Sequence, residues 1–165
     1  MKKLAVSLAI LALFCTGAAF AQSKNVVEAK FGTKPSSANF TVGLKYKGEA
    51  KAIAGFAFKV SYDPGQVSLT GATNNTGKSD AGVQYVVGPE VVADGKASRI
   101  VSMTTLKNLD KPGDLGELKF TKKASGDFVF SLEDRSTEPA DGLQDGELKE
   151  IQHTFDVSKV AGAAL

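Results

Sequence analysis

The stretch from Ile53 to Pro64 reads IAGFAFKVSYDP, and it decides the fold class of this 165-residue chain. Small or polar residues alternate there with apolar ones, namely Phe56, Phe58, Val60 and Tyr62. A β-strand turns successive side chains to opposite faces, so the pattern predicts one buried face and one solvated face. The run then ends at Asp63-Pro64-Gly65, which is turn chemistry. Strands of this kind build two-sheet sandwiches.

The rest of the chain repeats this alternation in short segments that turn residues separate. Eight further strands are predicted: Val26–Phe31, Asn39–Lys47, Gln66–Gly71, Val83–Gly88, Arg99–Leu106, Leu115–Lys122, Asp127–Glu133 and Leu148–Ser158. Ala93-Asp94-Gly95-Lys96 gives a hairpin signal. The phase of Arg99–Leu106 is ambiguous, because Val101 and Met103 share one face and Ile100 takes the other. Without a helical stretch, the sequence predicts an all-β protein, a nine-stranded β-sandwich in a jelly-roll or Greek-key arrangement.

The first 21 residues predict a secretory signal peptide. Lys2 and Lys3 precede the apolar run Leu4–Phe14, and Ala19-Phe20-Ala21 forms a small-residue cleavage site. The apolar run is short for a membrane anchor. Phe14 stands before Cys15, where a lipoprotein signal carries a small residue. We therefore expect residues 22–165 to form a single domain that is secreted or periplasmic in a bacterium.

Charge and cysteine content exclude several functions for this domain. Losing Lys2 and Lys3 from the 20 basic residues leaves as many as the 18 acidic ones, so the mature chain is formally neutral. A nucleic-acid or anionic-membrane partner would need a basic excess. Cys15 is the only cysteine and leaves with the signal peptide. The mature chain therefore has no disulfide, no cysteine nucleophile and no thiolate metal site.

The sequence gives little reason to expect an enzyme, and we predict no catalytic residue and no cofactor. His153 is the only histidine, and its parity with Ile151, Phe155 and Val157 places it inward or at the rim of a sheet. A structural histidine is favoured over a catalytic base, because no serine motif stands near it. With one histidine, a transition-metal site would consist mostly of carboxylates, which favours calcium or no metal.

The long acidic loop from Asp134 to Glu147 is the one candidate for calcium. Hard oxygen ligands at this density can hold Ca²⁺. The carboxylates in and beside the loop are Glu133, Asp134, Glu138, Asp141, Asp145 and Glu147. Their spacing fits no recognised calcium loop, and charge runs are usually solvated surface. We therefore predict no metal site and keep calcium in this loop as the alternative.

Several blocks of the sequence resemble cohesin domains in the same order. IAGFAFKVSYDP (53–64) resembles their third strand, which has a glycine-phenylalanine pair, alternating apolar residues and then tyrosine-aspartate-proline. The remaining blocks are FTVGLKYKG (40–48), the valine-leucine strand at 67–69, GDLGELKFTKKASGDFVFSL (113–132) and ADGLQDGELKEI (140–151). The match covers nearly all of the mature chain.

The resemblance implies a nine-strand jelly-roll sandwich and a role in protein docking. Cohesins usually bind a dockerin module, on bacterial surfaces or in cellulose-degrading assemblies. Such docking would link the protein to polysaccharide degradation. The same superfamily contains carbohydrate-binding modules, so a carbohydrate-binding module is the alternative function. The sequence has no tryptophan, and Tyr46, Tyr62 and Tyr85 are in the inward phase, which argues against a sugar platform. One departure concerns Gly55 and Ala57, which lack the polar side chains common at these positions in cohesins.

The predicted binding surface combines strand parity with the sheet order of cohesins, in which strands eight, three, six and five form the docking face. The candidate contact residues are Ala57, Lys59, Ser61, Gln84, Val86, Val129 and Ser131. Val86 and Val129 would be apolar residues on a polar surface, as interface cores often are. The expected partner is another exported protein, for which a dockerin-like module is one candidate, and a polysaccharide is the alternative partner.

Overall fold

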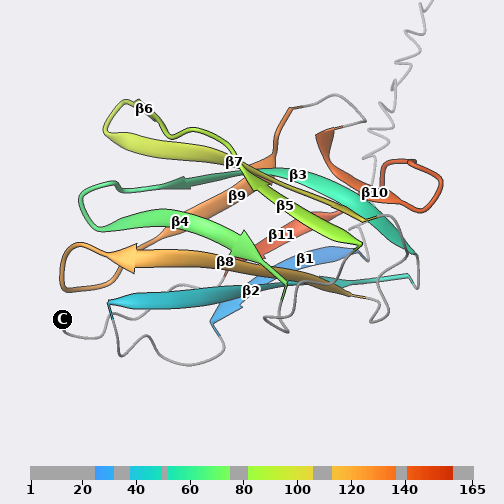
Figure 1. Cartoon of the computed structure of the whole chain (residues 1–165), viewed down its shortest axis with the longest axis horizontal. Helices are drawn as coiled ribbons and strands as arrows, with labels where there is room; N and C mark the ends of the chain where they lie inside the picture. The colour runs from blue at the N-terminus through green and yellow to red at the C-terminus, as the bar shows by residue number, and fades with distance from the viewer. Residues whose placement is uncertain are drawn as a thin grey trace, which may run out of the picture.

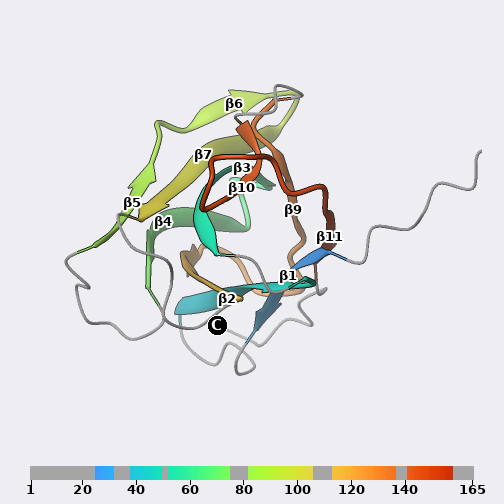
Figure 2. The same ribbon diagram turned by 90° about the vertical axis from the view of Figure 1, so that its right-hand side faces the viewer.

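The computed structural model describes residues 25–31, 38–49, 52–74, 82–105, 113–136 and 141–157. Figures 1 and 2 show two β-sheets that face each other across one core. The predicted signal peptide, residues 1–21, lies outside the described residues. Among the described residues, no helix is both long enough and apolar enough to cross a membrane.

One layer is a five-stranded sheet in the order β11-β1-β2-β8-β4. Its strands are β11 (Thr154–Val157), β1 (Val26–Phe31), β2 (Asn39–Lys47), β8 (Asp114–Lys122) and β4 (Val67–Thr73). β1 runs parallel to β11, whereas the other neighbours in this sheet are antiparallel. The first and last described strands of the chain therefore lie side by side.

The second layer is a six-stranded sheet built around β3 (Ile53–Tyr62) and β7 (Lys96–Thr105), which pair over most of their length. β5 (Val83–Val87) and β6 (Val91–Ala93) both pair with the free edge of β7. β9 (Phe130–Asp134) and β10 (Leu143–Asp145) share the other edge of β3. β9 takes the half that ends at Tyr62, and β10 takes the half that begins at Ile53.

The all-β sandwich is confirmed, but the described residues contain eleven strands, whereas we predicted nine. The two additional strands, β6 and β10, have three residues each, too few to show an alternating pattern. β10 lies inside the predicted acidic loop. The last strand is also shorter than predicted, because it begins at Thr154 and not at Leu148. Leu148 takes a left-handed backbone conformation with φ of 60°, which lies outside the β region.

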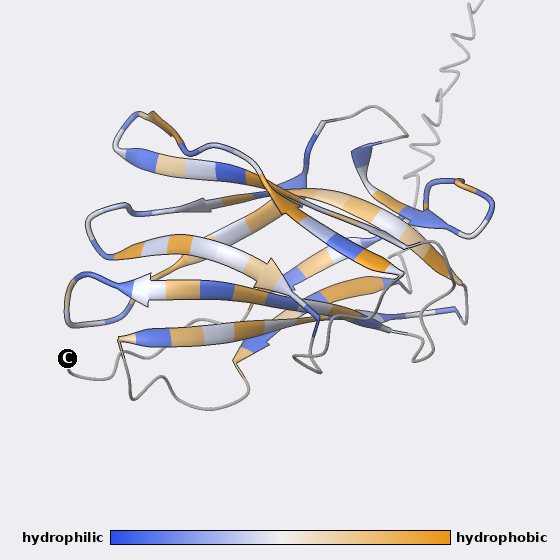
Figure 3. Ribbon diagram, viewed as in Figure 1, coloured by the Kyte–Doolittle hydropathy of each residue, from blue (hydrophilic) through white to orange (hydrophobic). Residues whose placement is uncertain are grey.

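The core follows the predicted alternation. Phe56, Phe58, Val60 and Tyr62 are all buried, and Figure 3 shows apolar and polar residues alternating along the strands. Phenylalanines from both sheets pack together in the middle, namely Phe31, Phe40, Phe120, Phe128 and Phe130. Burying one such side chain contributes roughly 1.5–3 kcal/mol, so this cluster is a main source of stability. Val101 and Met103 point into the core, which settles the phase of β7.

Polar groups close the open flank of the sandwich between β4 and β5. Arg99 on β7 donates hydrogen bonds from Nε to the Gly88 carbonyl and from Nη1 to the Leu69 carbonyl, both 2.7 Å long. Gly88 follows β5 and Leu69 lies on β4, so one guanidinium joins the two sheets. The Tyr85 hydroxyl, on the same flank, donates to the Leu115 carbonyl at 3.2 Å.

Candidate functional site

The outward side chains of the six-stranded sheet form a continuous surface, which we call the β3 face. Strand pairing arranges them in rows. The first row contains Ser131, Ser61, Ser98 and Val91, and the second contains Glu133, Lys59 and Ile100. The third row contains Ala57, Ser102 and Val86, and the fourth contains Thr104 and Gln84. The rows span β9, β3, β7, β5 and β6, which are separate segments of the chain.

Six of the seven predicted contact residues lie in these rows, and the seventh lies at their margin. Val129 comes just before β9 and is 63% exposed. It lines a hollow at the end of the sheet together with Ser61 and Ser131. The structure thus brings the predicted set onto one face, and Val86 is also exposed, at 62%.

Sequence reasoning missed the middle of the face. Ser98, Ile100, Ser102 and Thr104 come from β7, whose phase the sequence left ambiguous. The ambiguity arises because Ile100, on the outer side, is as apolar as the core residues beside it. Val91 was missed because β6 is too short to be recognised, although it is 59% exposed. The hairpin signal at Ala93–Lys96 was correct, with Asp94-Gly95 as the turn between β6 and β7.

Gly55 was expected to point outward from β3, but it is buried. A Cβ atom added at this position would lie 2.6 Å from the Met103 carbonyl oxygen. The glycine therefore permits a close approach of β3 to β7, rather than leaving a vacant place on the surface. Ala57, the other departure from the cohesin pattern, is half-buried on the face as expected.

The β3 face carries little charge. Within the rows given above, the charged side chains are Lys59 and Glu133, whose Nζ and Oε1 atoms form an ion pair of 2.8 Å. The other members are small, hydroxyl-bearing, amide or aliphatic. Covering such a surface requires the desolvation of one paired set of charges, and depletion of charge is the compositional mark of interface cores.

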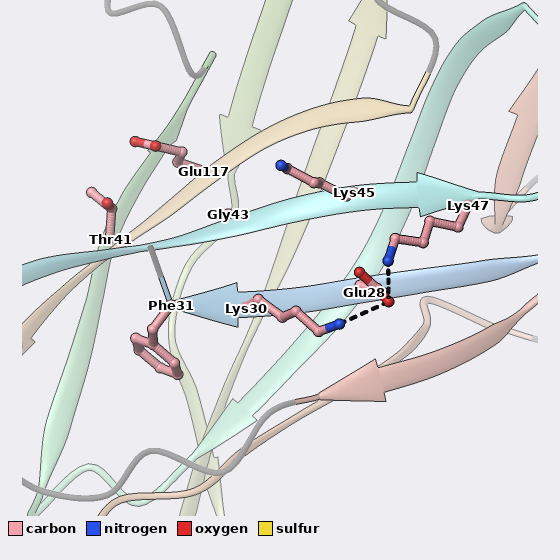
Figure 4. Close-up of a pocket in the computed structure, with 8 residues that line it drawn as sticks. All are labelled: Glu28, Lys30, Phe31, Thr41, Gly43, Lys45, Lys47 and Glu117. Atoms are coloured by element: carbon pink, nitrogen blue, oxygen red, sulfur yellow. Dashed lines mark ion pairs between the residues drawn. The ribbon is translucent and has the colours of Figure 1, made fainter. Parts of the chain in front are cut away.

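The outer face of the five-stranded sheet has the opposite character. Figure 4 shows Lys30 and Lys47 converging on Glu28, with 2.8 Å from each Nζ to the same carboxylate oxygen. Hydrogen bonds from Lys30 and Lys47 lower the pKa of Glu28. Lys45 and Glu117 also line this hollow. A surface of interspersed, paired charges is typical of a solvated face, so the two sides of the sandwich differ in what they offer a partner.

The described carboxylates of the acidic loop are engaged in contacts with neighbouring protein groups. Asp141 pairs with Arg135 at 3.5 Å and accepts a hydrogen bond from the Ser136 hydroxyl. Asp145 accepts hydrogen bonds from the backbone amides of Glu147 and Lys149. No group of three or more histidine, aspartate or glutamate side chains in the described ranges could hold a metal ion. Glu138 lies outside those ranges.

His153 points inward, at the flank between β9 and β11. Its side chain is 1% exposed, and its ring packs edge-on against Phe155. Nδ1 lies 2.8 Å from the Ile151 carbonyl oxygen, and Nε2 lies 3.3 Å from Oδ1 of Asp134. Burial raises the pKa of the Asp134 carboxyl, an effect that His153 opposes and Glu150 reinforces. A side chain so enclosed lacks the access that a catalytic base needs.

No aromatic residue is among the exposed large hydrophobic side chains in the described part of the chain. Those side chains are Val86, Val91, Val92, Val129 and Leu148. Tyr46 and Tyr62 are buried, and Tyr85 packs against the core. Flat exposed rings, on which sugar faces could stack, are therefore missing from the described surface.

Comparison with solved structures identifies the fold. A cohesin from Clostridium acetobutylicum is 15% identical, with a TM-score of 0.54, over 87% of this chain and 92% of that one. A type II cohesin from Acetivibrio cellulolyticus, solved with an X-dockerin, is 12% identical with a TM-score of 0.57, over 82% and 98%. A type I cohesin from Clostridium thermocellum, solved with a dockerin, is 15% identical with a TM-score of 0.53, over 82% and 93%.

The chain therefore has the fold of cohesin modules, a jelly-roll β-sandwich, as its resemblance implied. No protein-family model and no curated protein sequence matches the chain. At this level of identity the likeness extends to the fold, and the function has to be argued from the β3 face.

Proposed function

We propose that this protein is an exported, non-catalytic docking module that binds another exported protein through the β3 face. The observation that carries the proposal is the contrast between the two outer faces. Paired charges cover the outer face of the five-stranded sheet, whereas the β3 face has one ion pair among hydroxyls and aliphatic side chains. A partner can cover the β3 face at a small desolvation cost.

The cohesin fold supports a dockerin-like module as the partner. Two of the similar structures were solved as complexes with dockerins. Export rests on the leader in residues 1–21, which predicts a secreted or periplasmic protein. A link to polysaccharide degradation would follow if the partner belongs to a degrading enzyme. The carbohydrate-binding alternative has less support, because the exposed large hydrophobic residues in the described part are aliphatic.

The test is affinity capture from secreted and periplasmic fractions with residues 22–165 as bait, followed by titration calorimetry with the captured protein. A panel of purified dockerin modules and insoluble polysaccharides is titrated in parallel. Val86→Asp places a charge on the β3 face at its β5 edge. We expect it to weaken protein binding by at least tenfold, about 1.4 kcal/mol.

Val92→Asp is the matched control. Val92 is 59% exposed, similar to Val86, but it pairs with Ala97, which points into the sandwich. Its substitution adds the same charge on the other side of the sheet. Equal affinities for Val86→Asp and the unmodified protein would refute the proposed face. Binding to polysaccharide alone would instead support the carbohydrate-binding alternative.

A further inference from the structure

A hydrogen bond between Asp134 and His153 needs a proton between Oδ1 and Nε2, and the neutral imidazole ring has none there. Nδ1 of His153 faces the Ile151 carbonyl oxygen at 2.8 Å, and a carbonyl oxygen only accepts hydrogen bonds. Nδ1 must therefore carry the ring proton in the neutral imidazole. Nε2 is then left with a lone pair, directed toward Oδ1 of Asp134 at 3.3 Å.

Two acceptors face each other when the imidazole is neutral and the carboxylate is ionised. Both atoms are buried, and neither forms a hydrogen bond in this arrangement. Leaving such groups unsatisfied is costly. One added proton removes the conflict, whether it sits on Nε2 and forms an ion pair or on Oδ1 and donates to Nε2. Both forms contain the same number of protons, so the pair acts as one titrating unit.

The charged groups around the pair do not replace this proton. On β3 and β9, Lys59 is paired with Glu133, and after β9 Arg135 is paired with Asp141. Before β11, Glu150 adds negative charge near the carboxyl, and it accepts a hydrogen bond from Gln152. One hollow beside the β3 face is lined by Lys59, Glu133, Asp134, Arg135, Gly142 and Glu150. The net field of Glu150 favours retention of a proton on the pair.

The pair is placed to control the edge of the β3 face. Asp134 ends β9 and pairs with Phe58, and the preceding residue, Glu133, belongs to the face. His153 leads into β11 of the other sheet, and its ring contacts Phe58. A Cβ at Gly142 would lie 3.1 Å from Oδ1, so β10 also closes over the carboxyl. Opening this contact would loosen β9 and β10 together.

We propose that the proton shared by Asp134 and His153 is a pH-sensitive latch that fixes the β9 margin of the β3 face. This regulation rests on the proposed docking function. The latched state holds one more proton than the open state, so it is favoured at low pH and lost as the pH rises. Docking is then stronger in mildly acidic surroundings.

The single histidine makes the latch directly observable. Long-range ¹H–¹⁵N NMR of the ring reports which nitrogen carries the proton at each pH. No resonance assignment is needed, because all histidine signals come from one residue. We expect the Nδ1–H tautomer above the transition and a second proton on the pair below it. Release of one proton raises the unfolding equilibrium constant by up to tenfold per pH unit across the transition. An Nε2–H tautomer at high pH would overturn the proposal.

Asp134→Asn separates the latch from a merely structural contact. The asparagine amide donates a hydrogen bond to Nε2 of the neutral ring and does not titrate. The stability of this variant should therefore not fall as the pH rises from 5 to 8, as that of the unmodified protein does, and partner affinity should lose its pH dependence. Asp141→Asn, on the same loop, is the control and should keep the pH dependence of the unmodified protein.

The two proposals fail in different ways. If stability varies with pH equally in Asp134→Asn and in the unmodified protein, the latch is refuted whatever the protein binds. If the NMR and stability results hold but the affinity for a captured partner is independent of pH, regulation of docking is refuted. If the partner ignores Val86→Asp, the docking face fails, and the tautomer and stability profile still decide whether the latch exists.

Discussion

Replacing Arg99 by methionine removes a side chain that hydrogen-bonds both to Leu69 on β4 and to Gly88 at the end of β5. Methionine keeps most of the apolar stem of arginine but has no donor for the Gly88 and Leu69 carbonyls. Both bonds are short and come from a charged donor, the class that contributes about 1.5–3 kcal/mol each. The flank is only partly buried, so water replaces some of this energy.

We therefore expect Arg99→Met to lower the free energy of unfolding by about 2–3 kcal/mol. For a domain of this size, that corresponds to a fall in Tm of about 10 °C. Urea unfolding followed by circular dichroism measures the first quantity, and calorimetry the second. Arg99→Lys keeps the charge but loses the planar two-donor geometry. Its free energy of unfolding should therefore lie between those of the unmodified protein and Arg99→Met.

A loss below about 0.5 kcal/mol in Arg99→Met would refute the reasoning, since changes of that size are common for surface substitutions with no structural role. It would mean that packing alone holds the flank. Equal losses in Arg99→Met and Arg99→Lys would instead show that the two-donor geometry matters and the charge does not.

Three further predictions follow from buried groups. Phe58→Ala removes a fully buried ring that stacks on Phe56 at 4.4 Å between ring centres, and should cost about 3–5 kcal/mol in urea unfolding. Gly116→Ala combines a φ of 103° with a Cβ that would lie 2.6 Å from the Thr73 carbonyl oxygen, and should lower Tm more than Gly126→Ala, where φ is 108° but the space is open. Burial raises the pKa of Tyr62 to about 12, with a contribution from the hydrogen bond to Glu90. The raised value means that the stabilisation is present below about pH 10 and is lost as the pH rises toward 12, so phenolate absorbance should appear together with unfolding.

The sequence was sufficient to predict the sandwich because alternation fixes which side of each strand is buried. Phe56, Phe58 and Val60 were placed correctly from parity alone. The candidate face followed from the same parity and from the sheet order of cohesins, and the structure brings six of its seven residues into adjacent rows. Whether they bind a partner stays a prediction.

Features that depend on pairing between distant segments could not be predicted. β6 and β10 have three residues each and exist because β7 and β3 offer them an edge. From Val87 to Val91 the chain advances four residues while its partner on β7 advances three, so a bulge separates β5 from β6. The meeting of Asp134 with His153 depends on how two sheets pack, which no local pattern encodes.

The parallel pairing of β1 with β11 has a mechanical consequence. Because these strands run in the same direction, the chain enters the domain beside Thr154 and leaves it beyond Val157, at opposite ends of one ladder. Tension between residues 25 and 157 is thus directed along the strands and loads the β1–β11 ladder in shear. The hydrogen bonds of that ladder must therefore break nearly together, rather than one after another.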